Sequence, residues 1–360
     1  MDRIFLWLRH LLPGYQRSLS AQERCTLKIP SELVDMILEH LQPESAIAFA
    51  LTCRALFVKH FPKSAQLTAP ARATLLQWLE QDIPRLYFCH GCACLHPWRA
   101  TLQFSGYKFY HGPCWWNRRD IEPVMSKCVS DFRADLTYSW ARLVMNRHLY
   151  GALHGPPLQD IEATQRIYDS FYGVIITIFW SAKIISNNLY IHGTMVFRSD
   201  GEKGNAQSLR TFIEHFECSL VCRHLRAAII PELCRDEESS RPFHPTSGNI
   251  RSCPVCFTDY QIRVALGDSP RRTTRKSSQR EPIEGEDWSI EVARWHNLGE
   301  CRSPHDLEWC NLVTGSPSRI LVRREDMCGA GMVHRVWMKE DLGSTPIRET
   351  AVFSNSRDVI

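Results

Sequence analysis

The sequence lacks the short motifs on which several common enzyme classes depend. It contains no G-x-x-x-x-G-K-[ST], no G-x-G-x-x-G and no H-E-x-x-H, so phosphate-loop, dinucleotide and metalloprotease mechanisms are without their minimal residues. The chain has 15 cysteines and 15 histidines, so some Cys–His pair can be drawn for any fold and none points to a nucleophile. We therefore predict a protein that is not an enzyme.

Long apolar runs and a strong net charge are also missing. The longest apolar run, Phe171 to Trp180, is far shorter than the roughly 20 residues that span a bilayer. Near the N-terminus only Ile4 to Leu8 precedes Arg9, which is too short for the apolar core of a signal peptide. The formal net charge of +4 gives no chain-wide basic field. We expect reduced thiols, a location in the cytoplasm or nucleus, and neither membrane nor nucleic acid as a partner.

A stretch near the N-terminus carries the densest apolar pattern of the chain. Its apolar positions change phase at Pro43 and again at Thr52, which predicts three short helices. Leu33 and Ile37 lie one turn apart on a wide apolar face of the first helix. Pro43 suits the first position of the second helix, and Thr52 can cap the third. A unit below roughly 40 residues cannot bury all these side chains alone, so a partner should cover some of them.

This stretch resembles the F-box. The family opens with Leu-Pro-x-Glu-Leu, continues with Ile-Leu and ends with Cys-Arg; the chain reads Ile29-Pro30-Ser31-Glu32-Leu33, Ile37-Leu38 and Cys53-Arg54. Isoleucine at position 29 is the one departure in the opening, and it keeps the volume. A helical hairpin inside a larger core would show the same apolar signature.

The resemblance implies a role in ubiquitination. It implies that residues 27–62 bind the Skp adaptor and, through it, the cullin of an SCF-type ubiquitin ligase, while the rest of the chain holds an unidentified protein substrate. The chain would then be a non-catalytic subunit. The adaptor-binding residues that it implies are Leu27, Ile29, Pro30, Glu32, Leu33, Ile37, Leu38, Leu41, Leu51 and Leu56.

The remainder of the sequence predicts an α+β fold with helices and antiparallel strands. We expect residues 1–26 to form an amphipathic helix and linker, which could pack on its own domain or lie on a membrane surface. We assign the other parts as a helical linker with a first Cys/His module at 63–128, a substrate-side α+β domain with a second Cys/His module at 129–350, and a tail at 351–360.

Patterning within 129–350 predicts individual elements. Tyr138 to Tyr150 should be a helix ended by Gly151, and the period from Leu209 to Phe216 predicts another. The run GVIITIFW favours a buried strand, Gln261 to Leu266 alternates as a strand, and two short strands around 189–191 and 195–197 are separated by His192-Gly193. We expect a flexible insertion at 267–287, whose basic residues suit a solvated loop or a nuclear import signal.

The downstream Cys/His module pairs Cys222-Arg-His224 with Cys253-Pro-Val-Cys256. If 222–224 is extended, alternation puts Cys222 and His224 on one side. Four such ligands predict a closed structural zinc site. A helix continuing from Phe216 would instead stack Cys218 on Cys222, and the cysteines would then be ordinary buried thiols.

The upstream module runs from Cys89 to His96 and resumes at His111-Gly-Pro-Cys114. Cys89 and Cys92 form a knuckle that His111 or Cys114 could complete, so we predict a second zinc site at Cys89, Cys92, His111 and Cys114. Cys94 and His96 are rival ligands. Because several candidate ligands lie close together in the sequence, the sequence does not decide which four bind the ion.

A second resemblance covers nearly the whole chain. The order of an F-box, CHGCACLHPW, RLVMNRHLYG, CPVCFTDY, WHNLG and SPHDLEW is similar to a large group of F-box proteins from filamentous fungi. That resemblance implies a role for the F-box alone. The alternative from the residues is a zinc-dependent nucleic-acid-binding or regulatory protein, to which Arg271 to Arg280 would add charge and which would show steep salt dependence.

Overall fold

A computed structural model describes ten segments of the chain: residues 29–52, 54–61, 67–98, 136–200, 205–215, 221–225, 233, 243–267, 287–313 and 329–341. The chain divides into two compact units, residues 1–83 with 93–95, and residues 84–92 with 96–360. The segments expected at 1–26 and 351–360, and residues 268–286 of the expected insertion, lie outside the described residues. No helix in the described segments is long and apolar enough to cross a bilayer.

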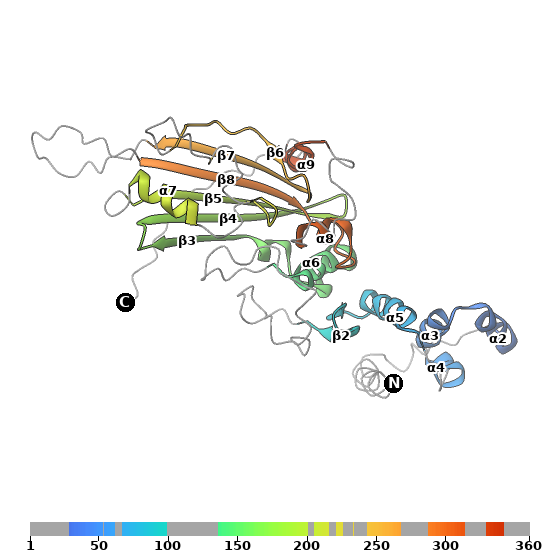
Figure 1. The fold of residues 1–360 in the computed structure, drawn as a ribbon. Helices are drawn as coiled ribbons and strands as arrows, with labels where there is room; N and C mark the ends of the chain where they lie inside the picture. The colour runs from blue at the N-terminus through green and yellow to red at the C-terminus, as the bar shows by residue number, and fades with distance from the viewer. Residues whose placement is uncertain are drawn as a thin grey trace, which may run out of the picture. The chain divides into compact units, whose positions relative to one another are not determined.

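The first unit is helical (Figure 1). It contains α2 (Ser31–His40), α3 (Pro43–Leu51), α4 (Arg54–His60) and α5 (Ala69–Asp82), the last of which lies in the expected helical linker. Its small interior contains Val34, Ile47 and Ala50, because α3 packs against both α4 and α5. The prediction that Thr52 caps the third helix is wrong. Thr52 closes α3 instead, and its hydroxyl donates to the Phe49 carbonyl at 2.8 Å.

The second unit is built on a six-stranded antiparallel sheet (Figure 1). Its strands are β3 (Ala163–Asp169), β4 (Val174–Ile185), β5 (Asn188–Ser199), β6 (Arg251–Ser252), β7 (Thr258–Gly267) and β8 (Asp287–Asn297). The order across the sheet is β3-β4-β5-β8-β7-β6. The central pair joins β5 to β8, strands that lie about 90 residues apart in the chain, so the sheet depends on contacts that local pattern cannot specify.

Helices cover most of one face of this sheet. The core there contains the inward side chains of β4 and β5, such as Ile176, Ile178 and Phe197, all at most 1% exposed. Against them pack α6 (Tyr138–Tyr150), α7 (Ala206–His215) and α8 (Leu307–Val313). Two short 3-10 helices, Ala152–His154 and Leu158–Ile161, connect α6 to β3. The helix predicted from Tyr138 to Tyr150 is confirmed, with Gly151 at its end at a φ of 103°.

The opposite face is covered at one end by α9 (Met332–Asp341). Trp337 of α9 packs with Tyr190 and Trp295 of the sheet. The buried carboxylate of Asp259 on β7 accepts a hydrogen bond from the backbone N–H of His334 at 2.8 Å. This N–H is in the first turn of α9, where the helix dipole favours a negative charge. Asp259 therefore holds the start of α9 on the sheet.

The expected break at His192-Gly193 is wrong, because β5 runs through it without interruption. A Cβ on Gly193 would lie 2.1 Å from the ring of Trp180, its cross-strand neighbour. The Trp180 ring crosses Gly193 and lies 4.4 Å from the guanidinium of Arg294 on the next strand. Glycine is therefore needed for packing, and the true turn is formed by Ser186 and Asn187, both with positive φ.

Candidate adaptor surface and metal sites

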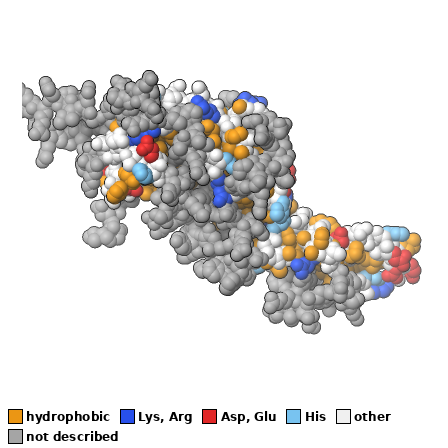
Figure 2. Space-filling view, viewed as in Figure 1, with side chains coloured by type: hydrophobic (Ala, Val, Ile, Leu, Met, Phe, Trp, Pro, Cys, Tyr) orange, Lys and Arg blue, Asp and Glu red, His pale blue; other side chains and the backbone are white. Residues whose placement is uncertain are grey.

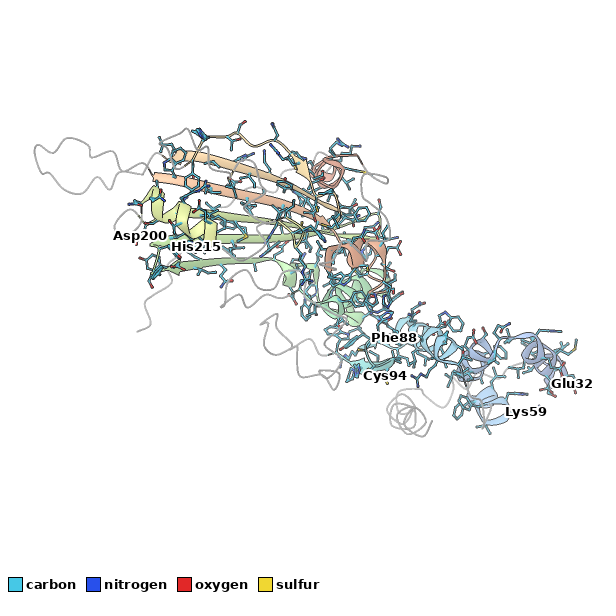
Figure 3. All side chains as sticks on the ribbon, viewed as in Figure 1. Glu32, Lys59, Phe88, Cys94, Asp200 and His215 are labelled. Atoms are coloured by element: carbon cyan, nitrogen blue, oxygen red, sulfur yellow. The ribbon has the colours of Figure 1, made fainter. Side chains whose placement is uncertain are left out.

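An apolar stripe lies on the outer surface of α2 and the residues just before it. Ile29, Leu33, Met36 and Ile37 are 44%, 49%, 56% and 39% exposed. Figure 2 shows hydrophobic side chains next to acidic ones at this end of the chain, and Glu32 and Lys59 mark α2 and α4 in Figure 3. So exposed a set of large apolar side chains indicates an interaction surface.

The residues implied by the F-box resemblance fall into several groups in the structure. Pro30 and Glu32 are exposed along with the stripe, whereas Leu38, Leu41 and Leu51 are half-buried. Leu56 is only 3% exposed, so in the free chain it packs inside the unit and presents no surface to a partner. Leu27 lies outside the described residues. The resemblance omitted Met36, although its spacing of three from Leu33 could have indicated it.

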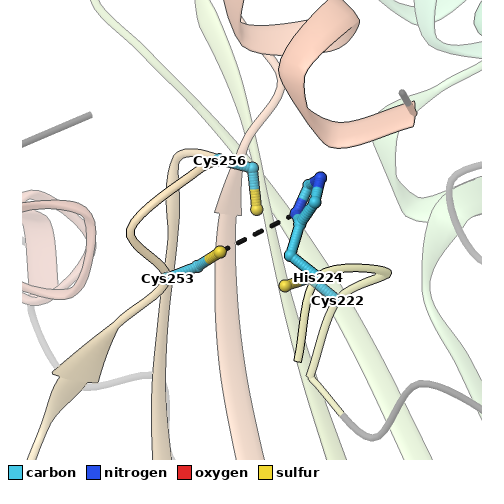
Figure 4. A group of neighbouring side chains, drawn as sticks. All are labelled: Cys222, His224, Cys253 and Cys256. Carbon is cyan, nitrogen blue, oxygen red and sulfur yellow. Dashed lines mark hydrogen bonds between the residues drawn. The ribbon is translucent and has the colours of Figure 1, made fainter. Parts of the chain in front are cut away.

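The downstream Cys/His module is brought together as predicted. The ligand atoms of Cys222, His224, Cys253 and Cys256 all lie within 4.8 Å of one another, and these residues could hold a metal ion. Figure 4 shows them converging from two segments, with His224 Nδ1 at 3.7 Å from Cys253 Sγ. The three cysteines are buried and His224 is half-buried.

The local structure around Cys222 differs from the extended one expected. The Leu225 N–H donates to the Cys222 carbonyl at 3.1 Å, so residues 222–225 form a tight turn. This turn, rather than strand alternation, brings Cys222 and His224 to the same side. The alternative of a helix through Cys222 also fails, while Cys218 lies outside the described residues.

Backbone hydrogen bonds shape the knuckle at Cys253-Pro-Val-Cys256. The Val255 N–H donates to Cys253 Sγ at 3.4 Å. The Cys253 N–H donates to the Thr258 carbonyl at 2.9 Å, and the Thr258 N–H donates to the Cys256 carbonyl at 2.7 Å. The knuckle therefore closes on the first residue of β7, which fixes where both sulfurs point.

Two further residues support Cys256. Thr258 Oγ1 lies 3.1 Å from Cys256 Sγ and 2.9 Å from His296 Nδ1. Burial, with the Arg294 guanidinium adding to it, lowers the pKa of His296 to about 3, so this imidazole is neutral at physiological pH. Sequence reasoning missed both residues. Thr258 stands two positions after Cys256, but His296 reaches the site only through the β7–β8 register.

The three buried sulfurs shift one another's pKa values. Burial raises the pKa of the Cys222 and Cys256 thiols, while hydrogen bonds from these two thiols lower the pKa of Cys253. Three sulfurs so close together cannot all ionise in an apolar interior unless a positive charge compensates them. Three sulfurs and one imidazole nitrogen are the donor set of a closed tetrahedral zinc site.

The upstream module forms a smaller group on a two-stranded hairpin, β1 (Leu86–Cys89) and β2 (Cys94–Pro97). Ligand atoms of Cys89, Cys92 and His96 lie within 4.8 Å of one another. His96 Nε2 is 2.9 Å from Cys92 Sγ, so the rival ligand His96 belongs to the group. The exposed Cys94 is not part of it. His111 and Cys114 lie outside the described residues.

Comparison with known proteins supports the assignment of the first unit. The F-box domain pattern matches residues 26–56, which span α2, α3 and the start of α4. No curated protein and no solved structure matches the chain. The chain therefore contains an F-box domain. An F-box points in general to a substrate-receptor subunit of SCF ubiquitin ligases, which are assembled on the Skp adaptor and a cullin.

Proposed function

We propose that this protein is a non-catalytic substrate receptor that connects an unidentified protein to an SCF-type ubiquitin ligase. The first unit binds the Skp adaptor and, through it, the cullin, while the second unit holds the substrate. One observation carries the proposal: Ile29, Leu33 and Ile37 of the matched F-box are all exposed together, although each is a large apolar side chain.

The exposed stripe has enough area to matter for binding. Burying a side chain of this size fully is worth roughly 1.5–3 kcal/mol, so covering its exposed half contributes about 1 kcal/mol per residue. Val34, between Leu33 and Met36, is 2% exposed and anchors the other side of α2. The helix can therefore keep its place when the stripe residues are truncated.

The test is a binding measurement with purified Skp adaptor and the full chain. The Pro30→Ala/Leu33→Ala double variant should bind the adaptor at least about tenfold more weakly, because it removes exposed contact area and an exposed turn residue. The matched control is Leu153→Ala, since Leu153 in the second unit is 54% exposed and similar in size to Leu33. Far-UV circular dichroism should be unchanged in both variants. Full adaptor affinity in the double variant would contradict the proposal.

We further propose that zinc is a structural cofactor of the second unit. Cys222, His224, Cys253 and Cys256 hold one ion, as their mutual distances and the buried sulfurs support. Because the two ligand pairs are about thirty residues apart, the ion ties the 222–225 turn to the start of β7. Such a site contributes directly to folding, since the ligands have no preformed geometry in the unfolded chain.

For the upstream module we propose a second zinc ion held by Cys89, Cys92 and His96, with His111 or Cys114 as the fourth ligand. The three described groups support it, because they lie within 4.8 Å of one another. A structural zinc site takes four ligands, so one more must come from elsewhere in the chain. Loss of one zinc equivalent in either His111→Ala or Cys114→Ser would identify that ligand.

A further inference from the structure

The six-stranded sheet has one edge and part of one face that no described element covers. β3 stands at that edge and pairs with β4 alone. At the opposite edge β6 is only 2 residues long, so β3, with 7 residues, is the longer edge strand. An edge strand exposes backbone N–H and C=O groups that can pair with another chain.

Nine side chains from three strands form a regular grid on the uncovered part of the sheet, which we call the open face. The registers align Thr164 with Phe179 and Thr194, Arg166 with Thr177 and Val196, and Tyr168 with Ile175 and Arg198. All nine are exposed or half-buried, whereas the intervening residues of β4 and β5 point into the core on the other side. The open face is therefore one continuous surface.

The part of this side that α9 covers begins one row beyond the grid. In that row Ser181 pairs with His192, and His192 with Trp295. The His192 ring stacks on Trp295 at 5.0 Å and lies 5.5 Å from Trp337 of α9. α9 thus contributes Trp337 to this row, while Phe179 in the next row is 44% exposed.

The charged side chains of the open face are Arg166 and Arg198, both exposed. On the next strand of the same side of the sheet, Glu291 of β8 stands beside Val196, but it pairs with Arg263 of β7 at 3.8 Å. The ion pairs among the described residues include neither Arg166 nor Arg198. Asp200, which follows β5, accepts a hydrogen bond from the Tyr168 hydroxyl at 2.7 Å. The two arginines are therefore available to an acidic partner.

The geometry suits an extended chain better than a helix. A strand added to β3 would run roughly 4.8 Å from it, with successive side chains on opposite faces. Its alternate residues would then stand beside Thr164, Arg166 and Tyr168 on the open face. Charged side chains on an edge strand also discourage pairing with chains of the same charge, so Arg166 selects for acidic segments.

We propose that the edge of β3 and the open face bind an extended acidic segment of the substrate protein, which adds to the sheet as a strand. Its backbone would pair with β3, and its Asp or Glu side chains, at alternate positions, would stand beside Arg166, while Arg198 on β5, two strands further in, adds positive charge at longer range. This inference rests on the proposed function only in naming the partner as the substrate. The binding mode is strand addition, in which backbone pairing gives affinity and alternate side chains give specificity.

The experiment measures fluorescence anisotropy of labelled peptides with the purified full chain. The probes are a peptide of alternating Val and Glu, its Val and Lys counterpart, and the Glu peptide methylated on alternate backbone nitrogens. The Glu peptide should bind at least about tenfold more tightly than the other two. The Lys peptide carries the opposite charge, and the methylated peptide lacks the N–H groups that donate hydrogen bonds to the edge of β3. Equal binding of the methylated and unmethylated peptides would overturn strand addition.

Variants of the chain locate the binding site. Arg166→Glu should weaken binding of the Glu peptide by at least about tenfold, since it replaces an attraction by a repulsion. Arg198→Glu should weaken it less, because β5 lies two strands further from the added chain. Arg335→Glu is the matched control, because Arg335 is an exposed arginine on α9, away from the open face. Thermal unfolding of each variant shows whether it is folded. Unchanged affinity in folded Arg166→Glu and Arg198→Glu would overturn the proposal.

Two further measurements separate the alternatives. An oligothymidylate that displaces the Glu peptide, with the same dependence on Arg166 and Arg198, would mark a nucleic-acid site and overturn the proposal. Binding of the Skp adaptor by the same Arg166→Glu preparation should equal that of the unaltered chain. Failure of the unaltered chain to bind the adaptor would refute the proposed function, while the peptide results would still decide whether the edge of β3 binds acidic segments.

Discussion

The two units of this chain treat their apolar side chains in opposite ways. The first unit leaves Ile29, Leu33 and Ile37 between 39% and 49% exposed, and its described residues bury few apolar side chains. The second unit packs helices on one face of a six-stranded sheet and buries residues such as Ile178, Phe197 and Trp309 completely. The comparison indicates that the first unit is completed by a partner, whereas the second supplies its own core.

The difference extends to how each unit is held together. The α2–α5 helices depend on local hydrogen bonds and a few buried contacts such as Val34 and Ala50. In the second unit, residues far apart in the chain meet, as Cys222 meets Cys253 and β5 meets β8. A change at a long-range junction should therefore damage the second unit and leave adaptor binding by the first intact.

The largest effect is expected from Cys253→Ser. We expect zinc content to fall by one equivalent per chain and the second unit to lose at least about 3 kcal/mol of stability, because the ion contributes to folding. Elemental analysis and thermal unfolding measure the two quantities. Cys310→Ser is the control, since Cys310 on α8 lies outside both metal groups.

Adaptor binding by the same variant tests whether the two units are independent. If the units are independent, Cys253→Ser should bind the Skp adaptor as the unaltered chain does. Unchanged zinc content in Cys253→Ser would show that the four residues are ordinary buried side chains. Loss of adaptor binding together with zinc would contradict the independence of the two units.

A smaller effect is expected from Gly193→Ala. The new methyl group would lie 2.1 Å from the Trp180 ring, which must move and lose its packing on Arg294. Overpacking of this kind costs about 1–3 kcal/mol. Chemical denaturation measures the loss, and Thr194→Ala, one residue further on the opposite face, is the matched control. Equal stability of the two variants would show that the Trp180 ring is not held against Gly193.

The smallest effect is expected from Asp259→Asn. The variant keeps a hydrogen-bond acceptor but removes the negative charge at the start of α9, which is worth about 1 kcal/mol. Hydrogen exchange should therefore become faster in α9, while α7 on the other side of the sheet serves as the internal control. Equal protection of α9 in variant and unaltered chain would mean that packing of Trp337 alone holds this helix.

Local signals in the sequence were sufficient for most helices. The period of the apolar residues and the glycine at its end predicted α6, Pro43 predicted the start of α3, and the GVIITIFW run predicted part of β4. The two metal groups could be predicted in part, because C-x-x-C is a local pattern. The choice of His96 over Cys94 could not be predicted, because both lie within four residues of Cys92.

Errors arose where one residue type serves two purposes. The sequence predicted a break at Gly193 because glycine is common in turns, but in the structure this glycine makes room for the Trp180 ring. An extended conformation was expected at Cys222 and His224, because alternation along a strand puts two such side chains on one side. In the structure a tight turn brings them together instead. At Gly193 the neighbour that decides the conformation is Trp180, on another strand, whereas the turn at Cys222 closes locally on Leu225.

The sequence by itself determined the F-box helices, the C-x-x-C knuckle at Cys253 and the α+β class, since each follows from the spacing of residues within a few turns or strands. Only the tertiary structure decided that a tight turn brings Cys222 to Cys253, that His296 supports Cys256 through Thr258, and that β3 stands at the edge of the sheet formed by the described strands. The physical reason is that these relations depend on strand order and register. Those are set by the packing of residues tens of positions apart, which no local propensity encodes.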